Sequence, residues 1–242
     1  MNVLSKIKIN SYSVYSALRA RGLVTVMRLI AVAIRDRSED RALGLEAHDF
    51  LDTAFHTRGH PNAPFANYYQ PTRSIPFREL LSILRPDANF NFVDIGAGTG
   101  KAMLLAAEYG YRCVRGVELV KELCDVAENN FKRFQKNFPH ARYEMKHADA
   151  LEFSLNEGDA FFFLNDPFSE EVFRPFLERI KEFSKSVPHE ILLVYKNNNL
   201  RQIPSLAEFV DHCSNYSEFD INGNFFQVYK IKGAAAGQTS IS

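Results

Sequence analysis

A short strand that runs into a glycine-rich turn and then into a helix constrains this chain more than any other segment. Residues 92–101 read FVDIGAGTGK, with glycines at Gly96, Gly98 and Gly100. After this turn, short apolar runs alternate with longer amphipathic segments. Because helices must cover both faces of a parallel sheet, such alternation predicts an α/β fold with a mostly parallel sheet.

Periodicity and helix-breaking residues predict the individual elements. We expect strands at residues 90–95, 112–117, 143–146, 160–164 and 191–195, and helices at residues 76–84, 100–109, 120–137 and 170–184. Two further β-rich runs, residues 216–220 and 225–231, flank Asn222-Gly223-Asn224, which predicts an antiparallel hairpin. The predicted fold is a Rossmann-like, doubly wound sheet of seven strands, mostly parallel, with an antiparallel C-terminal hairpin and an N-terminal helical cap.

The texture of the chain predicts three regions. Residues 1–73 form the helical cap and a connector, residues 74–232 the core, and residues 233–242 a loose tail. Within the cap we expect helices at residues 12–21, 23–35 and 45–55. The connector, in the stretch at residues 57–74, is rich in Pro, Gly and Asn, and it is long enough to suggest a function.

Composition excludes several classes of protein. Of 242 residues, 46% are hydrophobic and 24% charged, as in soluble globular proteins. The 29 basic residues balance the 29 acidic ones, which argues against a nucleic-acid partner. The apolar run at residues 22–34 is too short for a transmembrane segment, although the basic N-terminal helices leave peripheral membrane contact open. Cys113, Cys124 and Cys213 form no CxxC pair, so we expect no disulfide framework, no metal site and a cytoplasmic protein.

Two common classes of glycine-rich turn fit these residues poorly. A phosphate-binding P-loop requires a glycine where Ile95 stands and a hydroxyl residue where Ala102 stands. A dinucleotide-binding turn requires its third glycine where Lys101 stands, which weakens that interpretation without excluding it.

The pattern Asp94-x-Gly96-x-Gly98-x-Gly100 resembles the class I S-adenosylmethionine-dependent methyltransferases. Acidic or polar strand ends follow in the same order as in that family, at Gly116-Val117-Glu118, His147-Ala148-Asp149-Ala150 and Asn165-Asp166-Pro167-Phe168. Residues 55–59 and 67–72 are similar to a bacterial subfamily of these enzymes and, distantly, to lysine methyltransferases of the histone-methylating type.

The resemblance implies S-adenosylmethionine as the cofactor and assigns residues to its site. Glu118 would accept from the ribose hydroxyls, and Asp149 from the adenine amino group, with Ala150 beside it. The cofactor-binding residues implied in this way are Asp94, Gly96, Ala97, Gly98, Thr99, Gly100, Glu118, Leu119, Asp149, Ala150, Asn165, Tyr69 and Thr72.

The resemblance also implies a catalytic turn made of Asn165, Asp166, Pro167 and Phe168, similar to the Asn-Pro-Pro-Tyr/Phe turn of amino-methylating enzymes. It implies in-line methyl transfer to an amine of a protein lysine or a small molecule. The residues leave open whether Asn165 or Asp166 faces the acceptor. They also leave open a nicotinamide-dependent oxidoreductase and a module that binds S-adenosylmethionine or a partner without turnover.

Overall fold

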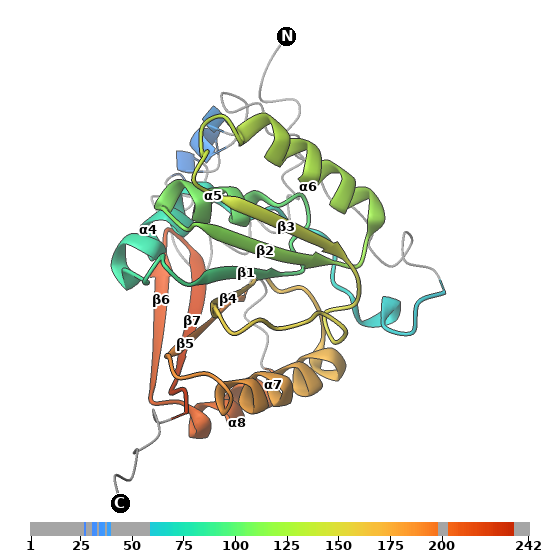
Figure 1. Ribbon diagram of the computed structural model, residues 1–242, viewed down its shortest axis with the longest axis vertical. Helices are drawn as coiled ribbons and strands as arrows, with labels where there is room; N and C mark the ends of the chain where they lie inside the picture. Colours follow the sequence, from blue (N-terminus) through green and yellow to red (C-terminus); the bar gives the residue numbers. More distant parts are fainter. Residues whose placement is uncertain are drawn as a thin grey trace, which may run out of the picture.

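A seven-stranded sheet forms the centre of the protein in a computed structural model (Figure 1), which describes residues 27, 31–32, 34–36, 38–39, 59–197 and 203–234. The strand order is β3-β2-β1-β4-β5-β7-β6. Neighbours from β3 to β5 pair in parallel, whereas β7 pairs antiparallel with both β5 and β6. The strands are β1 (Asn91–Ile95), β2 (Cys113–Glu118), β3 (Arg142–His147), β4 (Asp159–Leu164), β5 (Ile191–Asn197), β6 (Asn215–Ile221) and β7 (Asn224–Ile231). The predicted doubly wound sheet is confirmed.

Helices cover both faces of this sheet. Helices α4, α5 and α6 lie on one face and α7 and α8 on the other (Figure 1). Their bounds are α4 (Ser74–Leu84), α5 (Lys101–Tyr109), α6 (Lys121–Phe134), α7 (Glu170–Ser184) and α8 (Pro204–Phe209), with short 3-10 turns η2 (Ala63–Phe65) and η3 (Val210–His212).

Element ends differ from the prediction where a local turn intervenes. Helix α6 ends at Phe134 instead of continuing to residue 137, because the amide of Asn137 donates to the Phe134 carbonyl at 2.8 Å and turns the chain. The hairpin turn is confirmed at Asn222 and Gly223, which both have positive φ, as a two-residue turn between twisted strands requires. The predicted cap helices at residues 12–21 and 45–55, most of the one at 23–35, and tail residues 235–242 lie outside the described residues.

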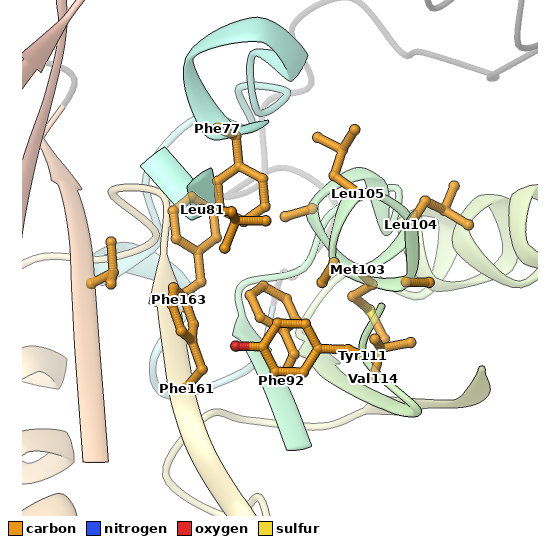
Figure 2. Close-up of a cluster of buried hydrophobic side chains, with 14 of the residues drawn as sticks. Phe77, Leu81, Phe92, Met103, Leu104, Leu105, Tyr111, Val114, Phe161 and Phe163 are labelled. Atoms are coloured by element: carbon orange, nitrogen blue, oxygen red, sulfur yellow. The ribbon is translucent and has the colours of Figure 1, made fainter. Parts of the chain in front are cut away.

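Alternating side chains of the central strands build two apolar layers. Phe161 and Phe163 of β4 pack with α4 and α5, whereas Phe162 between them packs on the α7 side. Figure 2 shows the first layer, in which Phe77 of α4 lies 4.7 Å from Phe163, centroid to centroid. A strand that is buried on both faces is apolar at most positions, which explains the continuous run of phenylalanines.

Among the described residues, no helix combines the length and the hydropathy that crossing a bilayer requires.

The ring of Tyr111 is buried in the first layer, 5.6 Å from Phe92 and 6.2 Å from Phe161, centroid to centroid, and its hydroxyl is buried with it (Figure 2). The hydroxyl has no hydrogen-bond partner in the described part of the chain, and an unsatisfied buried polar group is costly. We therefore expect Tyr111→Phe to unfold at equal or higher urea concentration, with a gain of up to roughly 1 kcal/mol. Tyr109→Phe, at a more exposed ring, is the matched control; a clear loss of stability in Tyr111→Phe alone would contradict this reading of the layer.

Candidate functional site

A pocket opens at the carboxyl ends of β1, β2 and β4, where the strand order reverses direction between β1 and β4. In open α/β sheets this is the place where ligands bind. The pocket is lined by three kinds of segment: strand ends and turns of the sheet, the first turn of α7, and the connector before α4. Its lining residues are Asn62, Ala66, Asn67, Tyr68, Tyr69, Gln70, Gly96, Val117, Glu118, Leu119, Val120, Ala148, Asp149, Ala150, Asn165, Asp166, Pro167, Phe168 and Val172.

The glycine-rich turn between β1 and α5 is held from β2. Gly96, Gly98 and Gly100 all have positive φ, a conformation that costs other residues energy. The amides of Gly96 and Ala97 donate to the Val117 carbonyl at 2.9 and 3.0 Å. The backbone of the turn is therefore hydrogen-bonded to the end of β2.

Protein side chains pack directly on these glycines. A Cβ at Gly98 would overlap the ring of Tyr69, and one at Gly96 would overlap Pro167. The Tyr69 hydroxyl is 2.8 Å from the Thr99 hydroxyl, which fixes the ring over the turn. The glycines thus allow both the connector and the turn after β4 to approach the end of β1.

Two acidic side chains are buried beneath the turn. Glu118 accepts from the amides of Gly98 and Val120 at 2.8 and 2.9 Å. Burial raises the pKa of the Glu118 carboxyl despite these bonds. Burial holds the pKa of Asp94 well above its usual value, and the charge of Glu118 raises it further. Two buried carboxyls in one place favour a cationic ligand.

Asp149 lies at the other end of the pocket, after β3. It accepts from the amide of Leu151 and from the side-chain amide of Asn62, both at 2.7 Å. His60 of the connector has its Nδ1 3.7 Å from an Asp149 oxygen. The connector therefore covers the pocket at Asp149 as well as at the glycine turn.

The connector also forms a bridge with the turn after β4. Ala66 and Phe168 pair as an isolated antiparallel bridge, and the amide of Asn67 donates to the Pro167 carbonyl at 3.0 Å. The structure thus brings the predicted catalytic turn and the connector together on one side of the pocket.

Neighbouring side chains from β5 and the connector hold Asp166. This residue, at a positive φ, accepts from the Tyr195 hydroxyl at 2.8 Å and from the side chain of Asn67.

Asn165 is held in the same way, by Lys196, Gln70 and Thr72. Burial lowers the pKa of Lys196 to about 7. Sequence reasoning missed Tyr195 and Lys196, although polar residues that end an apolar strand beside the catalytic turn are a usable signal.

Lys101, which follows the last glycine, does not serve as a phosphate-binding lysine. Its ammonium lies 3.5 Å from the carboxylate of Asp36, and both side chains are buried. The other Asp36 oxygen accepts from the amide of Ile75 at the start of α4. The pair joins the cap region to α4 and α5, which agrees with the absence of a P-loop pattern.

The predicted site residues divide into two groups. Those that line the pocket are Gly96, Glu118, Leu119, Asp149, Ala150, Tyr69, Asn165, Asp166, Pro167 and Phe168. The remaining predicted residues do not line the pocket; these are Asp94, Ala97, Gly98, Thr99, Gly100 and Thr72. Asn62, Asn67 and Gln70 line the pocket without having been predicted to bind a ligand, and Tyr68, which was expected with Tyr69 to cover the cofactor from the connector, lines it too.

Comparison with known proteins identifies the fold. Residues 77–173 match the family model described as histone methylation protein DOT1. A histone-lysine N-methyltransferase of Dictyostelium discoideum, H3 lysine-79 specific, is 31% identical over 105 residues, which cover 39% of this chain and 6% of that protein. The chain thus spans only a small part of the length of this curated relative.

Two solved methyltransferases are similar in structure. An RNA methyltransferase from Salinibacter ruber, in complex with S-adenosyl-L-homocysteine, has a TM-score of 0.51 and 15% identity and covers 67% of this chain and 94% of its own. An S-adenosylmethionine-dependent O-methyltransferase from Thermotoga maritima has a TM-score of 0.52 and 12% identity, and the match covers 70% of this chain and 69% of that protein. The predicted class I methyltransferase fold is confirmed.

The buried carboxyl of Asp94 predicts a stability trend with pH. Because the pKa of Asp94 is raised by folding, raising the pH through the interval above its unfolded pKa removes stability. We expect Asp94→Asn to be more stable than the wild type at about pH 8, by roughly 1–3 kcal/mol. The advantage should shrink towards about pH 4, near the ordinary pKa of an aspartate.

Urea unfolding at a series of pH values measures this difference. Asp125→Asn on the exposed face of α6 is the control, and we expect it to change stability by less than about 0.5 kcal/mol. A less stable Asp94→Asn at pH 8, or a difference that does not vary with pH, would show that the buried carboxyl is not a net cost.

Proposed function

We propose that the protein is an S-adenosylmethionine-dependent methyltransferase that acts on an amine nitrogen. The observation that carries this proposal is the charge of the pocket. Glu118, Asp149 and Asp166 line it, whereas no lysine or arginine occurs among its described lining residues. An acidic pocket with apolar walls suits a cationic nucleoside, and S-adenosylmethionine carries both an ammonium and a sulfonium group.

The residues present fit such a cofactor chemically. Glu118 supplies acceptors for ribose hydroxyls and Asp149 for the exocyclic amine of adenine, since each carboxylate has about four lone-pair sites. Val117, Ala148 and Val172 provide apolar lining for the base. The two buried carboxyls, Asp94 and Glu118, would become less costly beside a cation.

A nicotinamide cofactor fits less well. Its pyrophosphate would need backbone amides or cations, but the amide of Gly98 already donates to Glu118 and the third glycine of the dinucleotide pattern is Lys101. Lys101 itself is paired with Asp36. We therefore favour the methyltransferase over the oxidoreductase.

The cofactor, when bound, supplies a methyl group on a sulfonium. Transfer would join this methyl to a neutral acceptor amine as the carbon–sulfur bond breaks, with S-adenosylhomocysteine as the leaving group, and the methylated ammonium would then release its extra proton to solvent. This chain contributes alignment: the turn from Asn165 to Phe168 borders the pocket, with the Asp166 carboxylate and the Phe168 ring suited to an approaching amine. Alignment of this kind can supply ~7–11 kcal/mol of the barrier.

A protein lysine is the acceptor that we propose first, with a small amine as the alternative. The similarity to the Dictyostelium enzyme, which is specific for a histone lysine, favours it. Residues 77–173, which match the DOT1 family model, include the glycine turn and the turn after β4.

The three cysteines form no disulfide in the described structure, in keeping with the proposed cytoplasmic location.

Cofactor binding is tested by thermal unfolding with S-adenosylmethionine, S-adenosylhomocysteine and NAD. At about 100 times the dissociation constant, a specific ligand stabilises by ~2.7 kcal/mol. We expect the two sulfur compounds to raise the melting temperature and NAD to leave it unchanged. A shift with NAD alone would contradict the proposal.

Asp149→Asn tests the adenine contact. Its amide oxygen can still accept from Leu151, but the charge that favours the adenine amino group is lost and the contact with Asn62 is weakened, so Asn62→Ala, which removes only that contact, is the companion variant. We expect S-adenosylhomocysteine to bind roughly 10–100 times more weakly, as the loss of a charged hydrogen bond implies. Asp125→Asn should bind as the wild type does; equal affinity in Asp149→Asn would remove Asp149 from the site.

The acceptor class is tested by transfer of a radiolabelled methyl group to a protein extract, followed by complete hydrolysis. We expect label in methylated lysine, and no label when the enzyme has been heat-denatured. Label confined to RNA, or to alkali-labile esters, would contradict transfer to an amine.

A further inference from the structure

Two consecutive residues of β5 hold two consecutive residues of the turn after β4. Tyr195 donates to Asp166, and Lys196 donates to the Oδ1 atom of Asn165 at 3.2 Å. Since side chains alternate along a strand, the two contacts reach the turn from opposite faces of the sheet. Lysine is almost never fully buried, and Lys196 is only 4% exposed. A lysine in so costly a place calls for an explanation.

The contacts of Asn165 supply that explanation. Its Nδ2 atom donates to the Gln70 carbonyl at 2.8 Å and to the Thr72 hydroxyl at 3.2 Å. A carbonyl can only accept, so Gln70 requires the nitrogen on its side, and the Lys196 amine, which donates to Oδ1, favours the oxygen on the other. Both neighbours therefore select the same orientation of the amide.

Through Asn165 the interior of the sheet is joined to the connector. Gln70 directly follows Tyr69, whose ring lies on Gly98 and whose hydroxyl contacts Thr99. Without the donor of Lys196, only the connector side would select this orientation, and the flipped amide, whose oxygen would face the Gln70 carbonyl, would be populated more often. The connector would then be held less firmly over the glycine turn.

We propose that Lys196 is a positioning residue of this site: it fixes the orientation of the Asn165 amide and thereby holds residues 69–72 over the glycine turn. This inference rests on the proposed function in one respect: the pocket beside the glycine turn is the cofactor site. Arg73, Asp166, Asp36 and Lys101 lie close enough to act electrostatically on Lys196. The substitution Lys196→Met retains the length of the side chain and removes the donor.

Hydrogen exchange measured without ligand tests the inference by itself. In Lys196→Met we expect faster exchange in the segment around residues 67–72 and unchanged exchange in β1 and β4. Unchanged exchange in these strands would show that the fold is retained. Lys230→Met, on the neighbouring strand β7 and partly exposed, is the matched control and should exchange as the wild type does. Unchanged exchange around residues 67–72 in Lys196→Met would overturn the proposal.

A double-mutant cycle with S-adenosylhomocysteine as the probe tests the relay through Asn165. We expect Lys196→Met to weaken binding about tenfold, the change that corresponds to one ordinary hydrogen bond, and Thr72→Val to weaken it less. Because both act through one amide, the double variant should bind no more weakly than Lys196→Met. Additive effects would contradict the relay. Failure of the wild type to bind would instead count against the proposed function, while the exchange experiment would still decide the role of Lys196.

Discussion

The carboxylate of Glu118 is the contact on which the site depends. It accepts from the amide of Gly98 in the glycine turn and from the amide of Val120 at the start of α6, so one side chain joins the loop after β1 to the loop after β2. A loop of three glycines at positive φ has little intrinsic stability, and the buried carboxylate provides the fixed acceptor that it needs. The same carboxylate lines the pocket, so structural and binding roles meet in one residue.

The connector covers this edge of the sheet. It contacts three separate strand ends: Asn62 binds Asp149, Asn67 binds the turn after β4, and Tyr69 covers the glycine turn. Each contact uses a polar group that has its partner on the core. A ligand in the pocket would therefore be covered on this side by one continuous segment of chain, which would reduce its contact with water.

Local rules account for what the sequence predicts well. The glycine turn, the apolar parallel strands and the Asn222-Gly223 hairpin depend on neighbours in the chain, and each is present in the structure. The contacts of the connector depend instead on residues far away: 87 positions separate Asn62 from Asp149. Lys196 is a similar case, because only the pairing of β5 beside β4 brings it to Asn165. Periodicity carries no information on such pairs, so the connector could be suspected of function but not assigned contacts.

A crystal structure with S-adenosylhomocysteine would test the central claim most directly, namely that acidic strand ends and the connector together form a nucleoside site. The account predicts the ribose hydroxyls within hydrogen-bond distance of Glu118, the adenine amino group at Asp149, and Tyr69 still over the glycine turn. Adenosine bound elsewhere on the protein, or Glu118 in contact only with the backbone amides, would contradict it.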